Sequence, residues 1–186
     1  GKTVITLAIM RLLRKRGVKY QPAKSGPDYI DPKFHEVASG ESSVNLDAWA
    51  MRKEEIENLA GSGNLVVEGA MGLFDGAGVS GVGSSADLAK ILSLPVILVI
   101  DSGKTAHSIA AIVQGFKSFD NHVTVAGVIL NRVASDRHLN ILRAALSKID
   151  VPLLGFLFKS NIFSLSERHL GLVQASEKQN LEHWID

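Results

Sequence analysis

The sequence predicts an α/β fold with a three-layer, doubly wound and mostly parallel sheet. Short runs of valine, isoleucine and leucine recur along the chain, and segments with a helical spacing of apolar residues separate them. Strands that are apolar on both faces are typical of parallel sheets covered by helices on both sides. The 186 residues show no repeat, no low-complexity linker and no second core, so we expect one domain over residues 1–186.

The first predicted element is a helix over residues 4–16, which follows Gly1-Lys2-Thr3 and ends at Gly17. Its apolar side chains form a broad stripe suited to packing on a sheet, and glycine readily adopts the positive φ that often follows a helix. The predicted strands are short and apolar, and cover residues 18–23, 65–67, 95–101, 123–130 and 152–157. The predicted helices between them cover residues 46–59, 84–92, 106–116 and 137–146. Asn45 or Asp47 is the expected N-cap of the helix over 46–59, and residues 24–35 are expected to form a loop.

Charge and composition exclude several classes of function. Lysine and arginine number 20 against 19 for aspartate and glutamate, a net charge of +1, so we expect no nucleic-acid partner. The chain has no cysteine, which excludes a disulfide scaffold, a thiolate metal site and a cysteine nucleophile within it. The apolar runs are far shorter than a membrane span and no signal peptide is recognisable, so we expect a cytoplasmic protein without a membrane partner.

The first three residues indicate a nucleotide ligand. Gly1-Lys2-Thr3 at a helix start matches the last third of the phosphate-binding loop G-x-x-x-x-G-K-[ST]. In such a loop, backbone N–H groups and the helix N-terminus hold phosphate oxygens, the lysine reaches the β- and γ-phosphates, and the hydroxyl ligates Mg²⁺. We therefore expect Gly1, Lys2 and Thr3 to bind ATP, and Thr3 also to bind Mg²⁺. Taken alone, the tripeptide is equally consistent with a lysine that merely begins a helix.

Acidic residues follow two of the predicted strands, at the end of a doubly wound sheet where ligands bind. Glu68 ends the strand over 65–67, the position from which a carboxylate holds Mg²⁺ opposite a phosphate loop. Asp28 and Asp75 could complete an acidic cluster, and the alternative for Glu68 is a solvated loop position. Six glycines between residues 69 and 83 let the backbone approach a ligand, let the loop move, or simply form turns.

Five motifs occur in one order along the chain: Lys24-Ser-Gly-Pro-Asp-Tyr-Ile-Asp-Pro-Lys-Phe-His35, Asn45-Leu-Asp47, Val66-Val-Glu-Gly-Ala-Met-Gly-Leu-Phe-Asp-Gly76, Gly127-Val-Ile-Leu-Asn-Arg-Val133 and Ser166-Glu-Arg-His-Leu-Gly171. This series resembles the synthetase domain of the cobyrinic acid and hydrogenobyrinic acid a,c-diamide synthase family, from Gly1 to about Gln174. The resemblance implies a P-loop NTPase-like fold, similar to that of dethiobiotin synthetase. It also implies an ATP- and Mg²⁺-dependent ligase of cobalamin biosynthesis. Such a ligase amidates the a and c carboxylates of cobyrinic or hydrogenobyrinic acid through an acyl phosphate.

The same resemblance implies roles for the charged residues. Lys2 and Lys24 supply positive charge to the transferring phosphoryl group from two sides. The residues expected to organise Mg²⁺ are Thr3, Asp28 and Glu68. The residues expected to be catalytic are Lys24, Asp28 and Asp75, the last placed near the reacting centre.

Binding roles are also implied by the resemblance. Asn131 corresponds to the asparagine that reads the adenine edge. The residues expected to contact the corrinoid are Tyr29, His35, Asn45, Arg168 and His169, the last two as partners of its carboxylates. For His35 and His169, a hydrogen-bonded structural role is equally consistent with the sequence.

The chain departs from the family pattern at both ends. A strand and the first part of the phosphate loop are expected before Gly1, and the glutaminase domain that supplies ammonia, with its cysteine nucleophile, is not in this chain. We therefore expect the chain alone to use external ammonia. A homodimer is implied by the resemblance only. Residues 47–51 and 172–175 look more like the cobalt-free branch, but no residue identifies the metal content of the corrinoid.

Two other functions are compatible with parts of the sequence. One is a Walker-type switch ATPase of the partition or assembly kind, which would share Lys2 and a mobile glycine loop but not the signature over residues 26–35. The other is a non-catalytic structural remnant, suggested by the incomplete phosphate loop.

Overall fold

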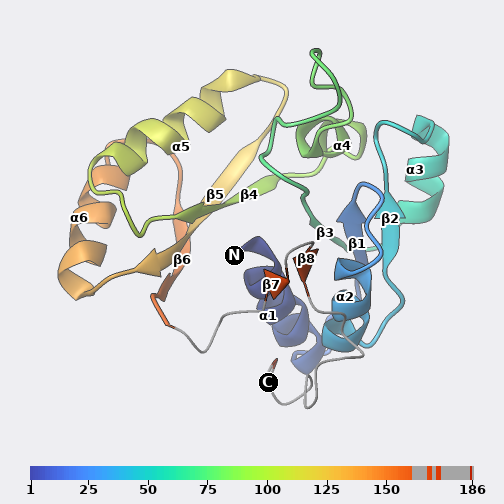
Figure 1. The fold of residues 1–186 in the computed structure, drawn as a ribbon, viewed down its shortest axis with the longest axis horizontal. Coiled ribbons are helices and arrows are strands. Elements are labelled where there is room, and N and C mark those ends of the chain that lie inside the picture. Colours follow the sequence, from blue (N-terminus) through green and yellow to red (C-terminus); the bar gives the residue numbers. More distant parts are fainter. Residues whose placement is uncertain (161–166, 169–170, 173–184, 186) are drawn as a thin grey trace. The chain divides into compact units, whose positions relative to one another are not determined.

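The computed structural model describes residues 1–160, 167–168, 171–172 and 185, which form two compact units (Figure 1). The unit that contains Lys2–Leu92, together with Ser164–Asp186, is termed the N-terminal unit. The unit that contains Ser93–Phe163, together with Gly1, is termed the C-terminal unit. Each is built on a sheet of three parallel strands.

The N-terminal unit alternates helices and strands in the order α1 (Lys2–Lys15), β1 (Gln21–Ser25), α2 (Asp31–Ser39), β2 (Val44–Leu46), α3 (Lys53–Ala60), β3 (Leu65–Glu68) and α4 (Ser85–Ile91). The strands lie in the order β2-β1-β3, so the chain moves to one side of β1 and then crosses to the other. Such a reversal is the place where doubly wound sheets bind ligands. A two-residue antiparallel pair, β7 (Glu167–Arg168) and β8 (Gly171–Leu172), follows late in the chain.

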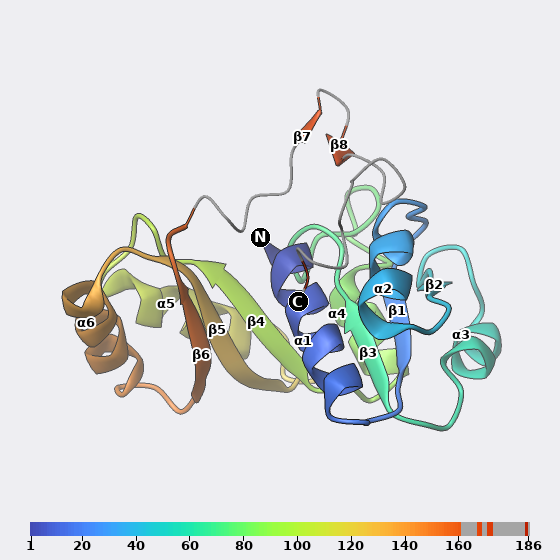
Figure 2. The same cartoon turned by 90° about the horizontal axis from the view of Figure 1, so that it is seen from below.

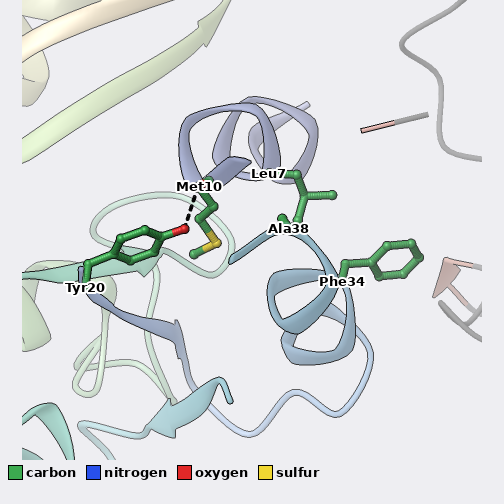
Figure 3. Close-up of a cluster of buried hydrophobic side chains, with 5 residues drawn as sticks. All are labelled: Leu7, Met10, Tyr20, Phe34 and Ala38. Carbon is green, nitrogen blue, oxygen red and sulfur yellow. Dashed lines mark hydrogen bonds between the residues drawn. The ribbon is translucent and has the colours of Figure 1, made fainter. Parts of the chain in front are cut away.

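Apolar side chains cover both faces of this sheet. Helices α1 and α2 lie side by side in both views (Figures 1 and 2), and their buried cluster with Tyr20 is drawn in Figure 3. The Tyr20 hydroxyl donates a hydrogen bond of 2.6 Å to the Met10 carbonyl oxygen within this cluster. The opposite face packs on α3 and α4 through Ala23, Leu46, Ile56, Ala60 and Leu88. The three layers expected from the sequence are therefore present in this unit.

The C-terminal unit repeats the alternation with β4 (Val96–Asp101), α5 (Ser108–Phe119), β5 (Val125–Val133), α6 (Asp136–Leu146) and β6 (Leu153–Phe158). Its strands lie in the order β4-β5-β6 and are parallel. Helices α5 and α6 pack on each other and on β5 (Figure 1).

The predicted alternation of helices with parallel strands is confirmed, and the described strands form two parallel three-stranded sheets besides the antiparallel pair of β7 and β8. Among the described residues, β3 pairs only with β1, and β4 pairs only with β5. The domain boundaries 1–186 stay a prediction. No helix in the described part of the chain is long and apolar enough to cross a membrane.

Three local predictions were wrong: the start of one helix, its N-cap, and a loop. The helix predicted over 46–59 begins only at Lys53, because residues 44–46 pair with β1 as β2 and the turn after them is closed by Asp47. The Asp47 carboxylate accepts the N–H groups of Trp49 and Ala50 at 2.9 and 3.2 Å, so Asp47 stabilises a turn and Asn45 lies in a strand. The segment expected to be a loop, residues 24–35, includes the start of α2, which has a proline in its first turn and is followed by Gly40 with φ of 79°.

Other element boundaries differ by a few residues. Strand β1 begins at Gln21 instead of residue 18, and β5 extends to Val133, so that Asn131 lies inside a strand. The first helix is confirmed, and Gly17 after it has the expected positive φ, at 69°.

Candidate active site

Strand register places two charged side chains next to each other. Lys24 of β1 is the direct partner of Glu68 of β3. Side chains alternate between the two faces of a strand, so Glu68 lies on the same face as Val66, which packs against the α1 and α2 cluster. Both residues are also near the carboxyl ends of their strands. The chain thus brings a cation and an anion together beneath the first turns of α1 and α2.

Glu68 is the centre of this site and is only 2% exposed. Its Oε1 accepts a hydrogen bond of 2.7 Å from Thr3 Oγ1, and its Oε2 lies 2.7 Å from His35 Nε2. Burial raises the pKa of the Glu68 carboxyl, but the hydrogen bonds from His35 and Thr3 and the charge of Lys24 outweigh burial and leave that pKa below its ordinary value. The carboxylate is therefore ionised at neutral pH.

Lys24 is a buried cation among three carboxylates. Its Nζ lies 2.5 Å from Asp31 Oδ2, 3.5 Å from Glu68 Oε1 and 3.9 Å from Asp28 Oδ2. Burial lowers the pKa of Lys24, yet attraction to Glu68 and the hydrogen bond to Asp31 more than offset it, so the pKa is raised. Burial and the charge of Glu68 raise the pKa of Asp31 despite its contact with Lys24. Lys24 thus holds its positive charge firmly.

Lys2 is the second cation of the site. It is half-buried, and its Nζ donates a hydrogen bond to the Met71 carbonyl oxygen in the loop after β3. Burial and the neighbouring charge of Lys24 lower the pKa of Lys2, while Glu68, Asp31 and Asp75 act in the opposite direction. Met71 has φ of 46°, a backbone strain of the kind that gathers at functional sites.

Asp28 shapes the turn that leads into α2. Its Oδ1 accepts the N–H groups of Ile30 and Asp31 at 2.7 and 3.1 Å. Asn45 of β2 donates from Nδ2 to the Asp28 carbonyl oxygen at 2.7 Å, which ties this turn to the sheet. The carboxylate oxygen that faces Lys24 is thereby held in place.

The arrangement combines two cations, a helix N-terminus, a hydroxyl and an ionised carboxylate. Lys2, Lys24 and the first N–H groups of α1 suit phosphate oxygens. Thr3 and Glu68 are oxygen ligands of the type Mg²⁺ prefers, and since Mg²⁺ keeps several waters, two protein ligands suffice. Within the described residues, no group of three His, Asp or Glu side chains could hold a metal ion by itself. The residues therefore fit a metal that arrives together with phosphates.

Six of the residues predicted for the site lie together in the N-terminal unit, namely Lys2, Thr3, Lys24, Asp28, His35 and Glu68. Of these, Glu68 is deeply buried, which contradicts the alternative of a solvated loop position. His35 has no exposed surface and contacts Glu68, and its predicted contact with the corrinoid stays a prediction.

For the other predicted residues the structure gives less information. Asp75 is exposed, and its Oδ2 accepts the Gly72 N–H at 2.9 Å, although Asp75 is near enough to influence Lys2. Tyr29 is 75% exposed. Asn131 belongs to the C-terminal unit. Of Arg168 only the backbone is described, and His169 lies outside the described residues.

Sequence reasoning missed Asp31 as a partner of Lys24 and Ser43 as a partner of His35. Asp31 belongs to the motif over residues 24–35. It begins α2, a helix that the sequence analysis did not predict, and recognising that helix would have indicated its place. In the C-terminal unit, Asp101 ends β4 as Glu68 ends β3, but its side chain is exposed. Asp101 Oδ2 lies 3.2 Å from Nη1 of Arg132.

Two glycines of the loop after β3 are required by the protein's own packing. A Cβ at Gly76 would lie 2.0 Å from the Gly81 carbonyl oxygen. A Cβ at Gly83, where φ is +78°, would lie 2.4 Å from the Cβ of Trp49. At these positions the glycines form turns and close contacts, the third of the roles considered for them.

The parallel α/β units, the helix that begins at Lys2 and the buried acid at a strand end define a nucleotide-binding domain of the P-loop class. The chain belongs to the CbiA family, described as the CobQ/CobB/MinD/ParA nucleotide binding domain, whose model matches residues 1–173. Relatives named hydrogenobyrinate a,c-diamide synthase match the whole chain. That of Brucella anthropi is 53% identical over 192 residues, and that of Rhizobium meliloti is 52% identical over 191. The relative of the same name from Mesorhizobium japonicum is 45% identical over 193 residues. The chain spans 44% of the length of each of these relatives.

Proposed function

We propose that this chain is the synthetase part of a hydrogenobyrinate a,c-diamide synthase, a ligase of cobalamin biosynthesis that amidates the a and c carboxylates of the corrinoid with ATP. The observation that carries the proposal is the 53% identity, over the entire chain, to synthases of that name. Cobyrinic acid, the cobalt-containing counterpart of hydrogenobyrinic acid, is the second candidate substrate. The clustered cations and the ionised Glu68 support the nucleotide-dependent step.

The reaction has two steps. A substrate carboxylate oxygen attacks the γ-phosphorus of ATP, the bond to the β,γ-bridging oxygen breaks, and ADP leaves with an acyl phosphate formed. Ammonia then attacks the acyl carbon, the C–O bond to phosphate breaks, and loss of a proton leaves the amide. Activation is required because a carboxylate is by itself a poor acyl donor.

In the first step the chain supplies fixed positive charge to the phosphoryl group. Lys24 is kept protonated by Asp31 and Glu68, and the same two carboxylates hold its buried ammonium group in place. Lys2 is held at the start of α1 through the Met71 carbonyl oxygen. Charges that are already oriented stabilise a phosphoryl-transfer transition state without reorganisation.

We assign Mg²⁺ binding to Thr3 and Glu68, with Asp28 as a third oxygen donor. Mg²⁺ bound there would neutralise phosphate charge. Thr3 Oγ1 and Glu68 Oε1 lie 2.7 Å apart, which supports a ligand shared by the first turn of α1 and the end of β3.

The other binding roles are further parts of the proposal. Asn131 contacts the adenine edge, while Tyr29, Asn45, Arg168 and His169 contact the corrinoid. Asp75 acts near the reacting centre, close enough to Lys2 to affect its pKa. Ammonia comes from a glutaminase domain in the longer protein, which we propose to be a cytoplasmic homodimer.

The test is mass spectrometry of the tetrapyrrole product. A protein of the relatives' length that contains this chain is given Mg-ATP, ammonium and either cobyrinic or hydrogenobyrinic acid in separate reactions. We expect a diamide from hydrogenobyrinic acid, which disappears with Lys2→Ala and with Glu68→Gln. No amide from either acid despite ATP binding would overturn the proposal. ATP hydrolysis stimulated by a protein partner and indifferent to corrinoid would indicate a switch ATPase.

A further inference from the structure

His35 contacts the centre of the site from inside the protein. It lies on α2, its side chain has no exposed surface, and both ring nitrogens have partners. Nε2 lies 2.7 Å from Glu68 Oε2 and Nδ1 lies 3.2 Å from Ser43 Oγ. His35 therefore connects the loop before β2 to the end of β3.

The chemistry of the partners assigns the proton on the ring. An ionised carboxylate only accepts hydrogen bonds, so Nε2 of His35 carries a hydrogen and donates it to Glu68. In the neutral imidazole Nδ1 is then an acceptor, and the Ser43 hydroxyl donates to it. Ser43, His35 and Glu68 thus form a chain of hydrogen bonds in which Ser43 donates to His35 and His35 donates to Glu68.

The two oxygens of Glu68 consequently have separate partners. Oε2 is held by His35, whereas Oε1 faces Thr3 Oγ1 at 2.7 Å and Lys24 Nζ at 3.5 Å. Because His35 holds Oε2, rotation of the carboxylate about its Cγ–Cδ bond is restricted. Oε1 is the oxygen that remains directed toward the side chains proposed to handle phosphate and metal.

We infer that His35 is a positioning residue that holds the Glu68 carboxylate so that Oε1 is presented, together with Thr3, to the Mg²⁺ of a bound Mg-nucleotide. The inference rests on the proposed function only for the use of Mg-ATP. His35 acts through Glu68 and does not touch the nucleotide. Ser43 contributes by fixing the ring tautomer.

Loss of the His35 donor leaves the carboxylate with a competing partner. Lys24 Nζ is a cation that lies 3.5 Å from Glu68 Oε1. Without the hydrogen bond to Oε2, the carboxylate is free to rotate, so that Oε1 can approach Lys24 more closely at the expense of its bond to Thr3. Partners of this outer kind typically change metal affinity by about 10- to 100-fold when they are removed.

The experiment compares two variants of His35 that differ in which ring nitrogen they replace. In His35→Gln the amide nitrogen takes the place of Nε2, which preserves a donor to Glu68. In His35→Asn the amide takes the place of Nδ1, which preserves the partner of Ser43 but not that of Glu68. In the protein of the relatives' length, the affinity for a non-hydrolysable ATP analogue is measured by calorimetry with and without Mg²⁺.

We expect the gain in affinity produced by Mg²⁺ to fall about tenfold in His35→Asn and to change less than about threefold in His35→Gln. Affinity without Mg²⁺ should be unchanged in both, which a merely unfolded variant would not show. Ser43→Ala should shift the Mg²⁺ dependence in the same direction by a smaller factor.

An undiminished Mg²⁺ gain in His35→Asn, or an equal loss of Mg²⁺-free binding in both His35 variants, overturns the inference. If His35→Asn does not fold, Ser43→Ala and His35→Gln decide it, because wild-type Mg²⁺ dependence in Ser43→Ala then counts against the chain of hydrogen bonds. Normal Mg²⁺ effects without any diamide product would instead reject the proposed function and leave the positioning role of His35 standing.

Discussion

The two units use the same parallel scaffold but differ in where they place charge. In the N-terminal unit the side chains of the Lys24–Asp31 ion pair are 7% and 9% exposed. In the C-terminal unit those of the Arg132–Asp101 pair are 54% and 57% exposed. A buried pair is strongly coupled to its surroundings, and removal of one partner leaves a charge without solvent. An exposed pair is screened by water and contributes little.

The two units also differ in the acidic residue that ends a parallel strand. Glu68 and Asp101 each end a parallel strand, yet only Glu68 is buried and held by three side chains. A strand end therefore indicates where chemistry can occur, while burial and partners decide which acid is organised for it. Four predictions test this difference, from the largest expected effect to the smallest.

Lys24→Ala should be the most destabilising single substitution among them. Asp31 and Glu68 would remain buried without their shared cation, and breaking a buried pair typically costs about 3–5 kcal/mol. Equilibrium urea unfolding at pH 7 measures the loss. Adding Asp31→Asn to Lys24→Ala should recover part of it, since one buried carboxylate is then neutral. A loss below about 1 kcal/mol would show that the cluster is not coupled as its burial implies.

N-cap serines offer a matched pair across the units. Ser84 is 4% exposed, its hydroxyl oxygen accepts the Asp87 N–H at 3.1 Å, and its own N–H donates to the Asp87 carboxylate at 3.1 Å. Ser135 is exposed and accepts the His138 N–H at 3.2 Å. We expect Ser84→Ala to lower the free energy of unfolding by about 1–2 kcal/mol, and Ser135→Ala by about 0.5 kcal/mol. Equal losses would contradict a difference based on burial.

Tyr20 tests a buried polar group that carries no charge at neutral pH. Burial raises the pKa of Tyr20 to about 12 from 10.0, so the folded state favours the neutral phenol. Its contribution is complete below pH 10.0 and is lost as pH rises toward about 12. Tyr20→Phe should cost about 1 kcal/mol at pH 7, through the lost bond to Met10, and should flatten the alkaline decline. An unchanged alkaline slope in urea unfolding would assign that decline to other groups.

Arg132→Ala should have the smallest effect on stability. Exposed pairs contribute about 0–1 kcal/mol, and Arg132 has φ of 61°, a strained value that Arg132→Gly would relieve. We therefore expect a change within about 0.5 kcal/mol for Arg132→Ala, and a similar or higher stability for Arg132→Gly. A loss comparable to that of Lys24→Ala would remove the distinction between the units.

Much of the fold could be predicted because its signals are local. The helix after Gly1 shows a regular apolar stripe and ends at a glycine with positive φ, as predicted. The strands from β3 to β6 are apolar runs, so they can be predicted from their own residues without knowledge of their pairing partners. By contrast, β2 has only three residues, and the pattern of residues 46–59 matched a helix until pairing with β1 and the turn at Asp47 overrode it.

The same division applies to the site. The sequence by itself determined the chemical types present, because a lysine and threonine at a helix start and a glutamate at a strand end are readable from neighbouring residues. Only the tertiary structure decided which side chains meet. The bond between Thr3 and Glu68 joins residues 65 positions apart, and that between His35 and Glu68 joins residues 33 apart. The role of His35 was open in the sequence because burial and hydrogen-bond partners are properties of packing, which local patterns do not contain.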